Sequence, residues 1–306
     1  MRANPGAGRW LVTGAAGMLG RDVLAVLGEE GIEAVGLGRT DLDITDRAAV
    51  RAAVEGVAVV VNCAAWTDVD GAESAEDAAT AVNGTGVRVL AEACAATGAR
   101  LLHVSTDYVL PGDAAQPYPE DAGTGPVNAY GRGKLVGERA VAELLPKDGY
   151  VVRTAWLYGE HGPNFVATML KLAAQRDTLD VVDDQHGQPT WSRALARRLA
   201  ELGRAALEGR APGGIYHGTA SGRTTWMGLA REAYRLAGLD PERIRPTTSE
   251  AFVRPAVRPA FSVLGHDRWS AAGLEPLADW RAQLAEAMTR QAFAGLVPDV
   301  TGNSAK

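Results

Sequence analysis

The sequence has few of the residues that mark a secreted or metal-binding protein. Its 306 residues include two cysteines, Cys63 and Cys94, and neither belongs to a pair with redox or metal-ligand spacing. We therefore expect two reduced thiols in the core of a cytoplasmic protein. The five histidines are scattered without metal-ligand spacing. The sequence thus indicates no metal site, although it neither requires nor excludes a bound metal.

Long apolar runs and an excess of positive charge are also missing. No run approaches the roughly 20 apolar residues that a membrane helix needs, and Met1–Gly6 holds no apolar signal region. The net charge of -6 and the pI of about 5.5 argue against nucleic acid or an anionic membrane as a partner. With 46% hydrophobic residues, the chain has enough apolar side chains for a large globular core.

Glycines are plentiful, and three of them follow the first apolar strand. Trp10–Val12 reads as that strand, and Thr13–Gly20 continues it with the spacing G-x-x-G-x-x-G before apolar residues at helical spacing. A strand, a glycine-rich turn and a helix set backbone N–H groups against a pyrophosphate. A tight turn without a ligand would also need glycines. The position directly after a strand favours a dinucleotide site.

The residues after the second expected strand, Ala34–Leu37, bear on the choice of cofactor. Arg39 lies roughly 20 residues past the glycines, where an acidic residue would bind the ribose hydroxyls of NAD. An arginine there favours a 2′-phosphate and therefore NADPH. Asp41 and Asp43 lie close by, so we expect a mild preference, with NADH as the alternative cofactor.

Short apolar strands alternate with helical patterns along the first half of the chain, which predicts an α/β fold with a doubly wound parallel sheet. After the first two strands we expect strands over 57–63, 101–104, 150–155 and 179–182, and helices over 74–96, 164–174, 192–208, 225–236 and 277–290. Asp46 and Asn128 are expected to cap helices. Asn83, inside the first of these helices, either is solvated or bonds the backbone at the end of the next strand.

Tyr130 and Lys134 are one helical turn apart if their segment is helical. A phenol has a pKa near ~10, and an adjacent ammonium would lower that pKa and make the phenol a better acid. Such a pair suits the donation of a proton to an oxygen that gains negative charge. Thr106, at a strand end, could hydrogen-bond the same oxygen. A Tyr four residues before a Lys is more often surface decoration when nothing else accompanies it.

Seven motifs, spread over nearly the whole chain, carry a family resemblance. They are TGAAGMLG (Thr13–Gly20), DLDITD (Asp41–Asp46), VNCAAWTDVDGAE (Val61–Glu73), STDYV (Ser105–Val109), YGRGK (Tyr130–Lys134), RTAWLYG (Arg153–Gly159) and DDQHGQPT (Asp183–Thr190). With them the chain resembles an extended short-chain dehydrogenase/reductase, and within that group the dTDP-4-dehydrorhamnose reductases. The glycines and the Tyr/Lys pair mark the superfamily, whereas STDYV, RTAWLYG and the last motif are more specific.

Past Tyr158 the alternation of strands and helices loosens, so we expect a Rossmann-type NAD(P)-binding domain over 1–158, a smaller and partly interwoven substrate-binding lobe over 159–300, and a disordered tail over 301–306. The resemblance implies that Tyr130 donates the proton, that Lys134 orients the nicotinamide ribose and that Thr106 assists at the carbonyl. The expected cofactor contacts are Gly14, Gly17, Met18, Leu19, Gly20, Arg39, Asp43, Ile44, Ala64, Ala65, Trp66, Val104, Tyr130 and Lys134. The expected substrate contacts are Thr106, Asp107, Trp156 and Arg258.

For Trp156 the alternative is packing in the core, and for Arg258 it is pairing with a surface carboxylate. Gln185, Gly187 and Thr190 are expected to shape a loop rather than to touch the ligands. Some relatives dimerise through a metal held by carboxylates. The sequence shows no matching acidic set here, so we expect a monomer or a homodimer.

The activity implied is NAD(P)H-dependent reduction of the C4 keto group of dTDP-4-dehydro-L-rhamnose to dTDP-L-rhamnose. One alternative is a nucleotide-sugar epimerase or dehydratase on the same fold. Related dehydratases place a second acid directly after the Thr-Asp pair, where Tyr108 stands in this chain. The other alternative is a non-catalytic regulatory subunit that binds the cofactor, against which the intact Thr106, Tyr130 and Lys134 argue.

Overall fold

The computed structural model describes residues 8–297, and its centre is a six-stranded sheet. The strands lie in the order β10-β5-β4-β3-β1-β2, and every pairing is parallel. Their bounds are β1 (Arg9–Thr13), β2 (Ala34–Leu37), β3 (Val57–Asn62), β4 (Arg100–Thr106), β5 (Gly149–Thr154) and β10 (Gly214–His217). The connections diverge between β1 and β3. In a doubly wound sheet this switch point leaves a crevice at the carboxyl ends of the strands, where ligands bind.

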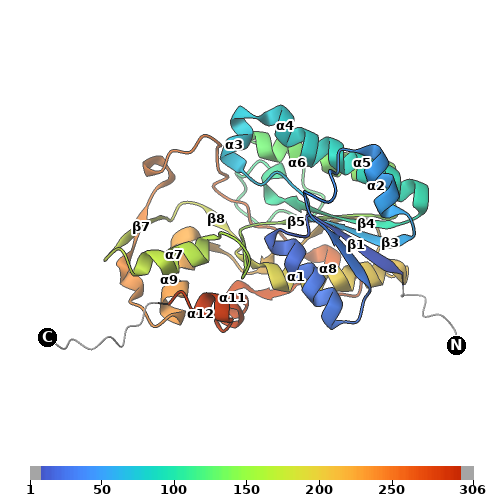
Figure 1. The fold of residues 1–306 in the computed structure, drawn as a ribbon. Helices are drawn as coiled ribbons and strands as arrows, with labels where there is room; N and C mark the ends of the chain where they lie inside the picture. The colour runs from blue at the N-terminus through green and yellow to red at the C-terminus, as the bar shows by residue number, and fades with distance from the viewer. Residues whose placement is uncertain (1–7, 298–306) are drawn as a thin grey trace.

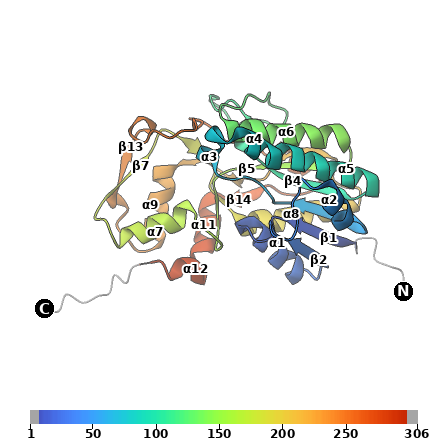
Figure 2. The same ribbon diagram turned by 45° about the horizontal axis from the view of Figure 1, so that its top comes forward.

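Helices cover both faces of the sheet (Figures 1 and 2). One face carries α1 (Met18–Glu29) and α8 (Ser192–Leu207), and the other carries α2 (Arg47–Val54), α5 (Val87–Thr97) and α6 (Ala129–Leu144). Because both faces are covered, the strands are apolar along their length, as parallel strands usually are. The expected doubly wound α/β fold is confirmed.

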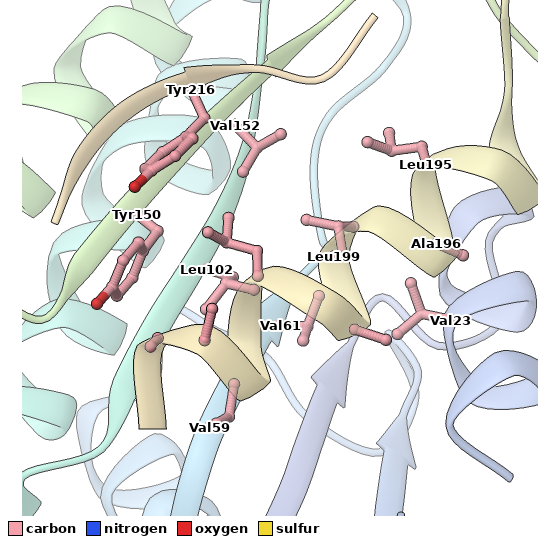
Figure 3. Close-up of a cluster of buried hydrophobic side chains, with 14 of the residues drawn as sticks. Val23, Val59, Val61, Leu102, Tyr150, Val152, Leu195, Ala196, Leu199 and Tyr216 are labelled. Atoms are coloured by element: carbon pink, nitrogen blue, oxygen red, sulfur yellow. The ribbon is translucent and has the colours of Figure 1, made fainter. Parts of the chain in front are cut away.

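The core beneath α8 joins the two halves of the chain (Figure 3). Leu195, Ala196 and Leu199 of α8 pack in one cluster with side chains of the sheet, including Val61 and Leu102. Full burial of one such aliphatic side chain stabilises the fold by roughly 1.5–3 kcal/mol. Helix α8 and strand β10 thus pack with the sheet although both follow residue 159. The division of the chain into domains at that residue stays a prediction.

The remaining elements form a second layer of structure beside the sheet, at the left of Figure 1. Its helices are α7 (Phe165–Ala173), α9 (Trp226–Leu236), α11 (Trp280–Met288) and α12 (Gln291–Ala294), whereas α10 (Asp267–Ala271) packs beside β10, with Trp269 in the core of the sheet. Its short strands are β6 (Leu157–Tyr158), β7 (Leu179–Val182), β8 (His186–Gly187), β9 (Thr190–Trp191), β11 (Ala220–Ser221), β12 (Thr224–Thr225), β13 (Ile244–Thr247) and β14 (Leu277–Asp279). They pair as β6–β9, β7–β13, β8–β12 and β11–β14. Most of these elements pack around a core that includes Trp191, Tyr234 and Trp280.

The expected helix over 74–96 is present over 76–97, but its middle forms a π-helical turn that the sequence did not indicate. The structure has α3 (Val69–Ser74), α4 (Glu76–Thr80), a π-helical turn (Ala81–Gly86) and then α5. The chain breaks at Ala75, whose φ of -138° and ψ of 43° are not helical. Alanine favours helix throughout this segment, but tertiary contacts of the buried Asn83 favour the wider turn.

The expected helix over 277–290 is wrong in its first turn. Leu277 and Asp279 belong to β14, which pairs with β11, and α11 begins only at Trp280. The Asp279 carboxylate accepts a hydrogen bond from the backbone N–H of Arg281 and so caps the shortened helix. The expected caps Asp46 and Asn128 are both confirmed. The tail predicted to be disordered, 301–306, lies outside the described residues.

Candidate active site

A cleft of about 1320 Å³ opens at the carboxyl ends of β1, β3 and β4. It is lined from both halves of the chain. The expected residues that line it are Gly14, Gly17, Met18, Leu19, Gly20, Arg39, Asp43, Ile44, Ala64, Ala65, Trp66, Val104, Thr106, Asp107, Tyr130, Lys134 and Trp156. Of the expected site residues, Arg258 is the one outside this lining. The structure therefore brings the glycine motif and the Tyr/Lys pair into one space.

Gly14 shows why the first turn needs a glycine. Its φ is +65°, and a Cβ atom at this position would lie 2.5 Å from the backbone nitrogen of Ala64. Any side chain would therefore push apart the loops that follow β1 and β3. Gly17 then begins α1, and the first helical residues Met18 and Leu19 line the cleft. A helix N-terminus with open backbone N–H groups suits a pyrophosphate.

Asn62, buried at the end of β3, holds the backbone that lies at the base of the cleft. Its Oδ1 accepts hydrogen bonds from the Thr13 hydroxyl at 2.6 Å and from the Ala64 N–H at 3.1 Å. Its Nδ2 lies 3.0 Å from Nδ1 of His103. The Asn62 side chain thus contacts residues of both β1 and β4. It thereby fixes the backbone of the small residues after β3, Ala64 and Ala65, at the place where a dinucleotide would lie.

Asn83 holds the neighbouring loop. Its Oδ1 accepts a hydrogen bond from the Trp66 N–H at 2.9 Å, and its Nδ2 donates to the Trp66 carbonyl at 3.0 Å. The side chain is fully buried, so the solvated alternative is wrong. The backbone contact is made, but after β3 rather than at the end of the next strand, β4. Asn83 lies in the π-helical turn, a conformation that often occurs at functional sites.

Two arginines lie at the β2 end of the cleft. Arg39 was expected there, and Arg21 of α1 was not. The nearby carboxylates are already engaged: Asp41 accepts from the Gly38 N–H at 2.8 Å, and Asp43 accepts from the N–H and the hydroxyl of Thr45. These Thr45 hydrogen bonds lower the pKa of the Asp43 carboxyl. The two acids that could offset an arginine therefore have local partners.

The proton-donor candidate Tyr130 lies in the first turn of α6. Asn128 caps this helix by accepting from the Gly131 N–H at 2.8 Å, and its Nδ2 donates to the Val257 carbonyl. Lys134 follows one turn later and is 2% exposed. Its ammonium donates a hydrogen bond to the Val104 carbonyl of β4 at 2.7 Å. The helix with Tyr130 is thereby fixed against the strand that ends at Thr106.

A buried ion pair also holds α6, the helix that carries Tyr130, against β5. Arg153 of β5 donates to both carboxylate oxygens of Glu138 on α6, at 2.8 Å and 3.0 Å for the shorter contacts. Ser105 of β4 donates to the same carboxylate at 2.6 Å. Breaking a buried, hydrogen-bonded pair by removing one partner is strongly destabilising. We infer that these three residues fix the spacing of α6, β4 and β5.

The charges around Tyr130 differ from the expected arrangement. Burial raises the pKa of the Tyr130 phenol, the Asp107 carboxylate raises it further, and hydrogen bonding with Thr106 works in the opposite direction. Burial lowers the pKa of Lys134 to about 8, although Glu138 and Cys63 oppose this. The expected lowering of the Tyr130 pKa by Lys134 is therefore wrong for the free protein. Its phenol is held protonated, which is the state a proton donor needs.

Asp107 is a buried acid at the end of β4. Burial raises the pKa of its carboxyl to about 6, against the lowering effect of the Ser262 and Thr106 hydroxyls. Its Oδ1 accepts from the Thr106 hydroxyl at 2.9 Å. Its Oδ2 is buried and has no hydrogen-bond partner within residues 8–297. An acceptor oxygen without a partner at the wall of a cleft suits a hydroxyl group of a ligand.

Arg258 lies apart from the cleft lining in this structure. Its Nη1 is 3.0 Å from Oδ1 of Asp70 on α3, and it also donates to the Ala256 carbonyl. The alternative of pairing with a carboxylate is thus what the structure shows. A role for Arg258 at the substrate pyrophosphate stays a proposal.

The loop after β7 does not reach the cleft, as expected for a shaping role. Gln185 bonds Ser249 and Trp226, and Thr190 donates its backbone N–H to the Trp156 carbonyl at 3.2 Å. Among the lining residues that sequence reasoning missed are Arg21, His161 and Trp226. Arg21 directly follows the glycine motif, which is a usable signal. His161 and Trp226 reach the cleft only through tertiary folding, and no local pattern marks them.

Within residues 8–297, no group of three or more His, Cys, Asp or Glu side chains is arranged to hold a metal ion. Arg193, in the first turn of α8, pairs with Glu29 of α1 at 2.6 Å. Over the same residues, no helix combines the length and apolar character needed to cross a membrane.

Comparison with known proteins places the chain in a family. Residues 8–293 match the family described as RmlD substrate binding domain. The chain belongs to this RmlD family. The resemblance inferred from the motifs is thereby confirmed.

Characterised relatives cover the RmlD-family chain almost completely. A dTDP-4-dehydrorhamnose reductase from Streptomyces griseus is 63% identical over 280 residues, which are 91% of this chain and 92% of the relative. A dTDP-4-keto-6-deoxy-D-glucose reductase from Streptomyces niveus is 51% identical over 91% of this chain and 96% of its own. The crystal structure of dTDP-4-dehydrorhamnose reductase from Bacillus anthracis in complex with NADP is 33% identical, has a TM-score of 0.87 and covers 92% of this chain and 99% of its own.

Proposed function

We propose that this RmlD-family protein is an NADPH-dependent reductase that converts dTDP-4-dehydro-L-rhamnose into dTDP-L-rhamnose. The observation that carries the proposal is the meeting of the glycine turn with Thr106, Tyr130 and Lys134 in one cleft. The names of the relatives at 63% identity and in the NADP complex support the substrate and the cofactor.

The residues of the cleft fit NADPH. Gly14 leaves room for the close approach of a dinucleotide between the β1 and β3 loops, and Met18 and Leu19, at the start of α1, would offer backbone N–H groups to its pyrophosphate. Arg39 and Arg21 suit the 2′-phosphate, because guanidinium groups bind phosphate oxygens through forked hydrogen bonds. Lys134 and Tyr130, which line the cleft, would hold the nicotinamide ribose. NADPH, when bound, supplies the hydride for the C4 carbon.

The side chains of this protein handle the proton. Tyr130 donates its hydroxyl proton to the C4 oxygen as negative charge develops there, and its raised pKa keeps that proton in place beforehand. The Thr106 hydroxyl, which donates to Asp107 in this structure, turns to donate its hydrogen bond to the same oxygen and stabilises its charge. Asp107 lines the cleft beside Thr106, where its carboxylate accepts a hydrogen bond from a sugar hydroxyl. Protonated Lys134, one helical turn from Tyr130, keeps a positive charge in the cleft when the phenolate remains.

The nature of residue 108 supports reduction over elimination. A dehydratase needs a second acid to expel the C6 hydroxyl, and Tyr108 occupies the position directly after Asp107. Burial raises the pKa of Tyr108, so this phenol is neutral and holds its proton tightly. An epimerase would regenerate its cofactor in each cycle and therefore would consume no NADPH. A non-catalytic subunit would have no need for the intact Thr106, Tyr130 and Lys134.

The relative from Streptomyces niveus supports a second candidate substrate, dTDP-4-keto-6-deoxy-D-glucose. The reacting C4 carbonyl is the same, and the two sugars differ in the configuration of ring carbons. The chemistry proposed for Tyr130 and Thr106 applies to both substrates. The choice between them depends on the shape of the wall that the sugar ring contacts.

NADPH consumption with each of the two sugar nucleotides tests the proposal, with products identified by NMR. We expect faster turnover of dTDP-4-dehydro-L-rhamnose, one NADPH oxidised per product, and loss of turnover in Tyr130→Phe. Preferential turnover of dTDP-4-keto-6-deoxy-D-glucose would make the second candidate the substrate. Isomerisation without NADPH consumption would identify an epimerase, and inactivity with both sugars would contradict the proposal.

The proposal also includes a cytoplasmic location and a monomer or homodimer without a nucleic-acid or membrane partner. The unpaired thiols of Cys63 and Cys94 support a reducing compartment. The net charge of -6 supports the absence of an anionic partner.

A further inference from the structure

Trp156 has a backbone conformation that a tryptophan seldom adopts. Its φ is +46°, and it is the one non-glycine residue with a positive φ within residues 8–297. Left-handed backbone is uncommon for bulky residues, so the surroundings of Trp156 must hold it there. The residue follows β5 by two positions and lines the cleft near Thr106 and Tyr130. The neighbours that hold its ring are therefore of interest for the site.

The main neighbour is Trp226, the first residue of α9. The two indoles stack with ring centroids 3.6 Å apart and an interplanar angle of 10°. Both rings line the cleft. Their stacking joins a residue at the end of the central sheet to a helix of the other half of the chain.

Three contacts hold Trp226 in place, two to its ring and one that caps its helix. Its Nε1 donates to Oε1 of Gln185 at 3.1 Å, and the ring of Phe165 packs at 4.7 Å between centroids. Thr225 caps α9 by accepting from the Gly228 N–H at 3.0 Å. A ring held in this way offers a rigid surface to Trp156 rather than a mobile one.

Gly187 leaves the space that the Trp156 ring occupies. A Cβ atom on Gly187 would lie 2.5 Å from Cε2 and 2.6 Å from Cζ2 of that ring. Gly187 belongs to β8, which pairs with β12 in the register Thr224 to Gly187. Strand β12 leads directly into Trp226. One small two-stranded sheet thus positions both the stacking partner and the residue that makes room for the ring.

From these contacts we propose that Trp226 is a positioning residue, which holds the indole of Trp156 in the cleft as a preformed wall for the sugar ring of the substrate. The identity of the ligand rests on the proposed function. A flat, apolar wall with few rotatable bonds binds a ligand with little loss of conformational freedom. If the ring of Trp156 were free to leave this position, the affinity for substrate would fall with the fraction of protein in the competent state. The cofactor end of the cleft would be unaffected.

The first test reads the position of the Trp156 ring directly. Protein labelled with 5-fluorotryptophan gives one fluorine NMR signal per tryptophan, and Trp156→Phe assigns the signal of Trp156. We expect that signal to be sharp in wild type and in Trp226→Phe, which keeps an aromatic partner. It should be broadened or split in Trp226→Ala and shifted in Gly187→Ala. Trp280→Phe, a buried tryptophan of the core outside the cleft lining, is the matched control and should leave it unchanged.

The second test compares the two Michaelis constants. In Trp226→Ala we expect KM for the sugar nucleotide to rise about ten-fold, as for a binding-competent fraction of about one tenth, while KM for NADPH stays within about two-fold. In Trp226→Phe the KM for the sugar nucleotide should stay within about three-fold, because stacking persists. A Trp156 signal as sharp in Trp226→Ala as in wild type, or an unchanged KM for the sugar nucleotide, overturns the proposal. If wild type reduces neither sugar nucleotide, the proposed function fails, and the NMR arm alone decides whether Trp226 positions Trp156.

Discussion

The ammonium nitrogen of Lys134 lies 2.7 Å from the main-chain carbonyl oxygen of Val104 and donates a hydrogen bond to it. Val104 precedes Thr106 by two residues on β4, and Lys134 follows Tyr130 by one turn on α6. This contact joins the two elements that carry the hydroxyl groups of the site. It also keeps a cation in the cleft without placing it directly against the phenol.

The pH dependence of the enzyme should reflect Lys134. Burial lowers the pKa of Lys134 from 10.5 to about 8, so the ammonium is present below that pH and is lost above it. We predict that kcat/KM for NADPH, which reports groups of the free enzyme, falls as the pH rises through about 8. Lys134→Met should have lower turnover and should lack this alkaline limb. The same limb in the variant would assign the titration to another group.

Tyr130→Phe removes the proton donor and little volume. We predict that turnover falls by roughly 10²–10⁴-fold, the usual contribution of a positioned general acid. The melting temperature should stay close to that of wild type, since the phenyl ring still fills the same space. Steady-state NADPH oxidation and thermal unfolding are the two measurements. Near-normal turnover in a well-folded variant would remove Tyr130 from the mechanism.

Asp107 should destabilise the folded protein at neutral pH. Burial raises the pKa of its carboxyl from 3.8 to about 6, so the native state binds this proton more tightly than the unfolded state. Any stability from the protonated acid is complete below pH 3.8 and is lost as the pH rises through about 6. Asp107→Asn should therefore raise the free energy of unfolding above pH 6, on the order of 2–3 kcal/mol, while activity falls.

Denaturant unfolding at neutral pH and below the ordinary pKa of the carboxyl checks this sign. The gain from Asp107→Asn should disappear at the acid pH, where the wild-type carboxyl is also neutral. Glu55→Gln, at an exposed position, is the control for removal of one negative charge. A gain of the same size at both values of pH would point to packing rather than to ionisation.

Local signals predicted the sheet and much of the cleft. Apolar strands followed by glycine or small residues place Gly14, Ala64 and Thr106 at one edge, because parallel strands share their carboxyl ends. The π-helical turn over Ala81–Gly86 was not predictable locally, since alanine-rich sequence favours a regular helix whatever the tertiary contacts of Asn83 require. Trp226 was not predictable for a similar reason, because only its stacking against Trp156, two residues after β5, brings it into the cleft.

The electrostatics of the site were less predictable than its residues. The spacing of Tyr130 and Lys134 is local, but the pKa of each depends on burial and on side chains from other elements. The Asp107 carboxylate, directly after β4, raises the pKa of Tyr130, and Cys63, directly after β3, acts on that of Lys134. Their effect on the two pKa values therefore required the three-dimensional arrangement.

Trp156→Ala should weaken the sugar nucleotide far more than the cofactor. Trp156 is an aromatic wall on the substrate side of the cleft, and its loss removes contact area there while leaving the glycine turn intact. Michaelis constants for both ligands and the melting temperature are the measurements. Equal weakening of both ligands, together with a large drop in melting temperature, would instead assign Trp156 to core packing.

Arg39→Ala should remove a preference for NADPH over NADH. The nearby Asp41 and Asp43 carboxylates have local hydrogen-bond partners, so the guanidinium is available to a 2′-phosphate. We predict a wild-type preference on the order of ten-fold in kcat/KM, which corresponds to about 1.4 kcal/mol, and nearly unchanged turnover with NADH in the variant. Arg21→Ala, at the same end of the cleft, should reduce the preference in part. Equal loss with both cofactors would show that Arg39 does not read the 2′-phosphate.

Transfer of deuterium tests the central claim most directly. The account predicts that NADPH deuterated at the transferable position of the nicotinamide delivers one deuterium to C4 of dTDP-4-dehydro-L-rhamnose, whereas the proton on the C4 oxygen comes from Tyr130. NMR and mass spectrometry of the product should show one deuterium, at C4, for each NADPH oxidised, and Tyr130→Phe should lower the yield in a given time. Product without deuterium at C4, or label lost to solvent without net reduction, would contradict a reductase.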